Sequence, residues 1–108
     1  MAPDDLDLGV PKGEENYLIN PEDWTEAIAA RLAAQQGIDL SEDHWRIIWF
    51  FREWYGEHGL APSARDAALF VKKINAPRSF LYNLFPYGYV SQACKIAGMK
   101  KPRAWSTG

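Results

Sequence analysis

The chain has 108 residues, of which 47% are hydrophobic and 24% charged, as is typical of one soluble globular domain spanning residues 1–108. No apolar run approaches the roughly 18 residues that cross a bilayer, and the acidic first residues lack the apolar core of a signal peptide. A single cysteine cannot form an internal disulfide and fits a reducing compartment. We therefore expect a monomeric, cytoplasmic protein without membrane contact.

Charge is distributed unevenly, although the formal net charge is only −2. Residues 1–66 contain all fourteen acidic side chains and five basic ones, whereas residues 67–108 contain seven basic side chains and no acidic one. Such a basic segment attracts acidic partners. Alternatively, it forms a solvated surface that the acidic half neutralises in the folded protein. The sequence leaves both interpretations open.

The N-terminal part is predicted to be extended. Residues 1–16 are acidic and rich in turn formers, and we expect them to be mobile. Two extended segments, 7–10 and 17–19, flank the turn signal Pro11-Lys12-Gly13. This arrangement predicts a small β-hairpin.

Two helices are expected next. Asn20 is predicted to cap the first, with Pro21 at its first position, and Gly37 to end it. The second is predicted to begin at Ser41 and to reach about Tyr55. Its residues are apolar on nearly every side, which is typical of a helix buried at the centre of a bundle.

Three further helices are predicted, beginning at Pro62-Ser63, at Pro77–Ser79 and near residue 90, and ending at about residue 74, at Pro86 and at Gly98. The residues expected to face inward are Ala64, Ala68, Val71 and Ile74, then Phe80, Leu81, Leu84 and Phe85, then Val90, Ala93, Cys94 and Ala97. The expected fold class is therefore mainly α (α+β). It is a compact bundle of about five helices, with the N-terminal hairpin and a C-terminal arm over residues 98–108.

Few side chains are arranged for catalysis. The sequence contains no P-loop, dinucleotide-binding fingerprint or nucleophile elbow. His44 lies in the first turn of a predicted helix, where a capping or surface role is expected, and His58 is expected in an exposed loop. Because Cys94 and the two histidines fit no zinc spacing, we expect neither a metal nor a cofactor.

Cys94 is the remaining candidate for a catalytic residue, and its neighbours support two interpretations. A cysteine on a short helix rich in alanine is usually a small core residue. Alternatively, Lys95, Lys100, Lys101 and Arg103 stabilise its thiolate, which would then attack a persulfide or disulfide.

Five ordered sequence blocks, at residues 20–24, 37–45, 51–55, 81–86 and 93–98, resemble the DsrC/TusE family of sulfur-relay proteins. The resemblance extends from about Tyr17 onward. It implies a small helical protein with an N-terminal β-hairpin and a C-terminal arm that bears sulfur on a cysteine. The cysteine would carry this sulfur as a persulfide in tRNA thiolation or sulfur oxidation, and as a trisulfide when the protein acts with sulfite reductase.

The resemblance places Cys94 at the inner of two arm cysteines. In the dissimilatory members a second cysteine follows eleven positions later as the penultimate residue, and here that position holds Trp105, followed by Ser-Thr-Gly. The resemblance therefore implies that the delivering thiol is absent, and one cysteine cannot run a two-cysteine trisulfide cycle. Trp105 is expected to anchor the arm, on the protein itself or in a partner's pocket.

Two functions follow from this resemblance. In the first, the chain is a sulfur carrier or thiol-based partner protein, with Cys94 as its only sulfur-bearing residue and without stand-alone enzyme activity. In the second, it is a carrier-inactive paralogue that regulates relay proteins or a sulfite reductase-like complex. For both functions, the expected partner-binding residues are Lys95, Lys100, Lys101, Arg103 and Trp105.

A third function comes from the residues alone. The third and fourth predicted helices would form a helix-turn-helix that binds nucleic acid, with Lys72, Lys73 and Arg78 at the phosphates. The negative net charge counts against it.

Overall fold

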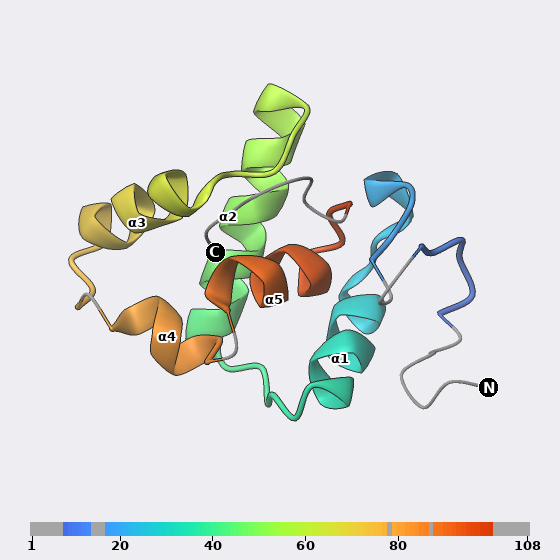
Figure 1. Ribbon diagram of the computed structural model, residues 1–108, viewed down its shortest axis with the longest axis horizontal. Coiled ribbons are helices and arrows are strands. Elements are labelled where there is room, and N and C mark those ends of the chain that lie inside the picture. Colours follow the sequence, from blue (N-terminus) through green and yellow to red (C-terminus); the bar gives the residue numbers. More distant parts are fainter. Residues whose placement is uncertain (1–7, 14–16, 78, 87, 101–108) are drawn as a thin grey trace.

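The computed structural model describes residues 8–13, 17–77, 79–86 and 88–100 (Figure 1). Its helices are a 3-10 helix, η2 (Pro21–Asp23), and α1 (Glu26–Gln35), α2 (Glu42–His58), α3 (Ala64–Lys73), α4 (Phe80–Leu84) and α5 (Tyr89–Ile96). The predicted bundle of about five helices is confirmed. Within the described residues, no helix has the length and apolar character needed to cross a membrane.

The N-terminal segments approach each other in the predicted antiparallel sense. Lys12 and Leu18 form an isolated antiparallel bridge, and the Gly13 N–H donates to the Tyr17 carbonyl at 2.7 Å. The described residues contain no strand, and residues 14–16 lie outside them, so the β-hairpin stays a prediction. Of the segment expected to be mobile, residues 1–7 also lie outside the described part, whereas Leu8 is buried in the core.

The first α-helix begins later than predicted. Asn20 precedes η2, and its side chain caps no backbone N–H. Trp24 then adopts an extended backbone with ψ of 143°, which interrupts the helical run. Thr25 is the actual N-cap of α1, because its Oγ1 accepts a hydrogen bond from the Ile28 N–H at 3.2 Å.

The predicted starts of α2 and α3 are confirmed by their capping interactions. Ser41 and Ser63 both cap through capping boxes, in which the side chain of the third helical residue accepts a hydrogen bond from the capping residue's backbone N–H. The end of α2 differs from the prediction, since the helix continues past Tyr55 to His58. His58 is exposed as expected, but it is helical rather than in a loop, and its ring lies 4.2 Å from that of Trp54.

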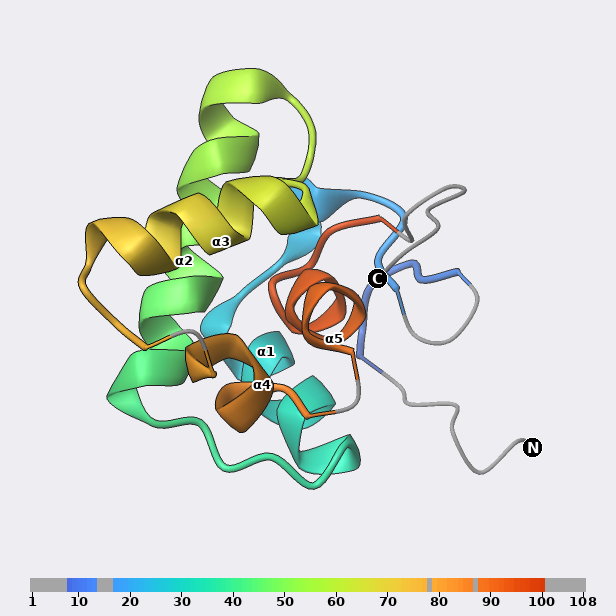
Figure 2. The ribbon, with the colours of Figure 1, turned by 60° about the vertical axis from the view of Figure 1, so that its left-hand side comes forward.

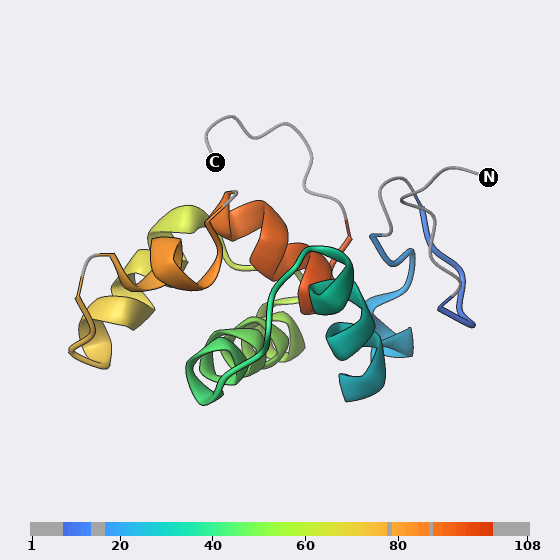
Figure 3. The ribbon, with the colours of Figure 1, turned by 90° about the horizontal axis from the view of Figure 1, so that it is seen from below.

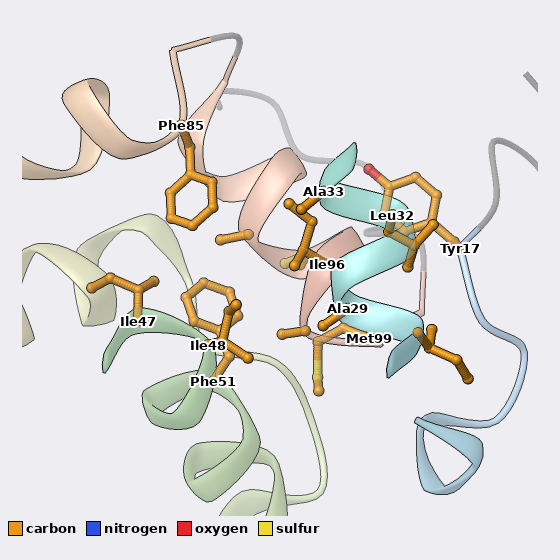
Figure 4. Packing of buried hydrophobic residues seen from close by; sticks show 14 of the residues in the cluster. Tyr17, Ala29, Leu32, Ala33, Ile47, Ile48, Phe51, Phe85, Ile96 and Met99 are labelled. Carbon is orange, nitrogen blue, oxygen red and sulfur yellow. The ribbon is translucent and has the colours of Figure 1, made fainter. Parts of the chain in front are cut away.

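The central helix is α5, and the prediction that α2 occupies the centre is wrong. α5 packs against α1, α2 and α4, and Figure 2 shows it seen nearly end-on among them. α2 buries only the face that carries Ile47, Ile48 and Phe51, whereas Trp49 on another face is 41% exposed. The small buried residues Ala93, Cys94 and Ala97 let other helices approach α5 closely. Figure 4 shows the core side chains Ile48 and Phe51 of α2 on the side that faces Ile96 of α5.

The two shorter helices partly follow the prediction. Val71 of α3 is buried as expected, but Ala67 is buried in place of Ala68, because Ala67 lies one helical turn before Val71 on the same face. Leu81 of α4 and the following Phe85 are buried as predicted. With five residues α4 forms little more than one turn, so it adds no support to the helix-turn-helix alternative.

Candidate functional site

Cys94 lies on α5 with only 1% of its surface exposed. Burial raises the pKa of its thiol to about 12, because an apolar environment disfavours the charged thiolate. At pH 7 the thiolate fraction is then on the order of 10⁻⁵. In this conformation Cys94 is a core residue and not an activated nucleophile.

The basic residues that were expected to activate Cys94 have other surroundings. The Lys95 Nζ lies 5.1 Å from the centre of the ring of Tyr17, a buried residue, and forms a cation–π contact with it. Lys100 is exposed. The expected partner-binding residues Lys101, Arg103 and Trp105 lie outside the described residues.

Two side chains from other parts of the chain hold the C-terminal end of α5. The indole Nε1 of Trp24 donates to the Ile96 carbonyl at 2.9 Å, and Nη1 of Arg52 donates to the Ala97 carbonyl at 3.0 Å. The Arg52 guanidinium also lies 4.6 Å from the centre of the Trp24 ring. Carbonyls at a helix end lack partners within the helix, so this pair, which we call the α5 clamp, satisfies two of them.

The clamp lies beside an acidic group. Burial lowers the pKa of Arg52, and the nearby Glu22 carboxylate partly opposes this effect. The pKa of Glu22 is lowered by hydrogen bonds from its own backbone N–H and from the Tyr55 hydroxyl, which lies 3.0 Å from Oε2. The same hydrogen bond raises the pKa of Tyr55. The negative charge of Glu22 therefore helps to balance the cation of the clamp.

Gly98 turns the chain sharply after α5. Its φ is +79°, its N–H donates to the Lys95 carbonyl, and the Met99 N–H donates to the Cys94 carbonyl at 2.9 Å. This is the Schellman pattern of a helix end. A Cβ at Gly98 would lie 2.7 Å from both Cβ and Cγ of Trp24, so glycine is required here.

The segment predicted as an arm, residues 98–108, therefore begins inside the core. Gly98 and Met99 are buried, and Lys100 is the first exposed residue after α5. Because the α5 clamp and the Gly98 turn hold this end of the helix, they determine where the following residues leave the folded body.

Two buried polar side chains, His44 and Gln92, form hydrogen bonds between elements that pack around α5. The His44 Nδ1 accepts from the Ser41 N–H at 3.0 Å, and its Nε2 donates to the Leu84 carbonyl at 3.0 Å. The capping role expected for His44 is confirmed, but a surface position is wrong, since only 9% of the residue is exposed. Gln92 of α5 donates to the Gln36 side chain at the end of α1, at 2.6 Å.

Trp24, Arg52 and Gln92 were not predicted as site residues because their partners lie far away in the sequence. Arg52 donates to a residue 45 positions later, and Trp24 to one 72 positions later. The available signal was that Arg52 is the only basic residue between 47 and 55, a mostly apolar stretch. Within the part of the chain that the structure describes, no group of three or more His, Cys, Asp or Glu side chains could hold a metal ion.

Known proteins resemble the chain over most of its length. Residues 7–104 match the family described as DsrC like protein. The sulfurtransferase TusE of Photorhabdus laumondii is 44% identical over 95 residues, covering 82% of this chain and 83% of that protein. TusE of Yersinia pseudotuberculosis is 41% identical over 92 residues, with coverage of 82% and 85%.

Solved structures show the same fold. The NMR structure of Allochromatium vinosum DsrC matches with a TM-score of 0.76 at 40% identity, over 88% of each chain. The oxidized gamma subunit of the dissimilatory sulfite reductase of Archaeoglobus fulgidus also gives a TM-score of 0.76, at 31% identity and over 90% of this chain and 92% of that one. The chain therefore belongs to the DsrC/TusE family of sulfur-relay proteins.

Proposed function

We propose that the chain binds the partner proteins of a sulfur relay without carrying sulfur itself in the conformation described. The observation that carries this proposal is the burial of Cys94, its only thiol, which is 1% exposed and has a pKa of about 12. A relay cysteine must reach a donor and an acceptor, and its thiolate must be accessible. Cys94 meets neither requirement.

The partner surface in this proposal is the C-terminal arm together with Lys95 of α5. Lys95, Lys100, Lys101 and Arg103 supply positive charge, and Trp105 supplies a large anchor. Such side chains favour an acidic partner surface with an apolar pocket. The relatives are sulfurtransferases and sulfite reductase gamma subunits, so we take the partners to be relay proteins or a sulfite reductase-like complex. The proposal includes a monomeric single domain with the N-terminal β-hairpin of the family.

A second candidate function keeps Cys94 as a sulfur acceptor, because it is the only thiol in the chain. After local opening of α5, its thiolate would attack the outer sulfur of a donor persulfide. A new S–S bond would form at Cys94, the donor's S–S bond would break, and the donor would leave as a thiolate. This route requires α5 to separate from the helices that pack against it.

Intact-mass spectrometry after incubation with glutathione persulfide separates the two functions. We expect the native protein to remain unmodified, and the same protein in urea to gain about 32 Da, the mass of one sulfur atom. The Cys94→Ala variant provides the control, since it should gain nothing in either condition. Rapid, complete addition of sulfur to native protein, abolished in Cys94→Ala, would establish the carrier function instead.

A binding measurement tests the partner function directly. Purified dissimilatory sulfite reductase without its gamma subunit is titrated with the chain in a calorimeter. We expect Cys94→Ala to bind like the unchanged protein and Lys100→Glu to bind more weakly, with a steep dependence on salt. A matched reversal at Lys72, which is exposed on α3, should have a smaller effect. Equal effects at both lysines would contradict an arm-based interface.

A further inference from the structure

One face of α2 is left uncovered by the fold. α5 lies on one side of α2, and among the described residues no helix lies on the opposite side (Figure 3). Two open hollows of about 490 and 360 Å³ occur between this face and α3. They adjoin at Phe50 and Phe70, whose rings stack at 4.3 Å between centroids. We call the pair the α2–α3 groove.

The lining of the groove is aromatic and apolar. Its large apolar residues are Trp45, Trp49, Phe50, Trp54, Leu69 and Phe70. Trp49 is 41% exposed and Leu69 is 55% exposed. The other four are partly buried. Exposed apolar side chains beside a hollow often mark a binding surface, and tryptophan is enriched where binding energy concentrates.

The spacing of these residues indicates the shape of the occupant. Trp45 and Trp49, like Phe50 and Trp54, are four residues apart and therefore form two ridges along α2. Four side chains of α3 form the opposite wall of the smaller hollow, and Phe70 alone represents α3 in the larger one. A groove between two helices, with ridges along its length, accommodates the apolar face of a third helix.

The charges beside the groove indicate the chemistry of that helix. Glu53 lines both hollows, and Glu42 and Glu57 each line one. Glu53 and Glu57 form no ion pair within the described residues. Of the basic residues there, Arg46 already lies 3.9 Å from the Asp43 carboxylate. The other is Lys73, so the lining holds the two bases Arg46 and Lys73 against four acids, Glu42, Glu53, Glu57 and Asp66. The groove therefore offers a net negative charge next to apolar rings.

We propose that the α2–α3 groove binds an amphipathic helix of a partner protein, in which lysine or arginine side chains flank large apolar residues. The apolar face would cover the exposed tryptophan and leucine, and the basic side chains would meet Glu53 and Glu57. The groove lies across α2 from α5 and uses neither Cys94 nor Lys100. This second surface therefore does not depend on the function proposed above, and each proposal can fail alone.

A synthetic amphipathic peptide of leucine and lysine, about five helical turns long, is the probe. Its affinity is measured by fluorescence anisotropy, and its position by amide shift changes in NMR spectra. We expect binding that maps to α2 and α3, and no binding of the same peptide with glutamate in place of lysine. Glu53→Lys should weaken binding about tenfold, because it replaces attraction by repulsion at the middle of the groove.

Glu26→Lys, at an exposed site on α1, is the matched charge control and should weaken binding less than about twofold by long-range charge alone. Trp49→Ala tests the apolar contact without changing charge and should also weaken binding. Equal loss in Glu53→Lys and Glu26→Lys, or shift changes elsewhere, would overturn the proposal. So would a dimer in sedimentation that Glu53→Lys dissociates, because a second copy would then be the occupant.

Discussion

Replacing Gly98 by alanine should destabilise the fold through two separate effects. The first is conformational: at φ of +79° a residue with a Cβ adopts the left-handed region, which costs about 1–2 kcal/mol. The second is steric, because the new Cβ would lie 2.7 Å from two carbon atoms of Trp24. Displacing a packed side chain typically costs a further 1–3 kcal/mol or so. The expected total loss is about 2–5 kcal/mol.

Gly37 provides a matched control for the conformational effect. It ends α1 as Gly98 ends α5: the N–H of each glycine donates to the carbonyl three residues earlier, and the next N–H to the carbonyl five residues before it. Its φ is +74°, yet an added Cβ would meet nothing within 4 Å. Gly37→Ala should therefore destabilise the fold only through the conformational effect, by about 1–2 kcal/mol.

Urea unfolding followed by circular dichroism at 222 nm gives the free energy of unfolding of both variants. The comparison holds when this free energy falls with urea concentration at the same slope in each. A double-mutant cycle with Trp24→Ala then isolates the steric effect, since Gly98→Ala should cost no more than Gly37→Ala once the indole is gone. Equal losses of stability in the two glycine variants would refute the steric effect. So would a cost of Gly98→Ala that stays unchanged when the Trp24 side chain is removed.

Three other measurements test the site. Trp24→Phe should lower the free energy of unfolding by about 1–2 kcal/mol more than Trp54→Phe does. The Trp24 indole donates to α5, whereas the Trp54 Nε1 is buried without an acceptor in the described chain. Equal losses of stability would contradict this role of Trp24. Arg52→Met should cost about 1–3 kcal/mol, and the exposed Arg46→Met under about 0.5 kcal/mol, by urea unfolding. For Cys94, the folded pKa of about 12 exceeds the ordinary 9.0, so native stability is kept below pH 9 and falls above it by about 1.4 kcal/mol per pH unit. Parallel stability curves for the native protein and Cys94→Ala between pH 8 and 10 would exclude this effect.

The helix boundaries that depend on local chemistry could be predicted from the sequence. Ser41 and Ser63 begin their helices because a serine three residues before a side-chain acceptor satisfies backbone groups without help from elsewhere. Gly98 ends α5 for an equally local reason. Asn20-Pro21 carries an equally strong local signal, yet it begins only a single 3-10 turn. There Trp24 leaves the helical conformation and hydrogen bonds to α5, a contact that no local pattern encodes.

Burial was harder to predict than helicity. α2 is apolar around most of its circumference, but composition does not indicate which face other helices will cover, and only one face is covered. The inner position belongs to α5, because Ala93, Cys94 and the C-cap Ala97 are small and allow several helices to approach. The two interpretations of Cys94 stayed open for the same reason: proximity of lysines in the sequence does not determine where their ammonium groups lie. The Lys95 ammonium lies over the Tyr17 ring.

Cys94 is buried, and side chains from other elements hold the neighbouring end of α5. Trp24 and Arg52 hold the last carbonyls of α5, and Gly98 packs on Trp24, so the chain leaves the core at a defined point. A fixed exit would favour the docking proposed above, because less freedom is lost on binding. The same rigidity opposes sulfur transfer at Cys94, since a second sulfur atom would have to fit into a filled core, at a cost of about 1–3 kcal/mol. Variants that loosen the α5 clamp should therefore weaken partner binding and at the same time make Cys94 more reactive toward persulfide. Loosened variants that bind partners as tightly as the unchanged protein would contradict this argument.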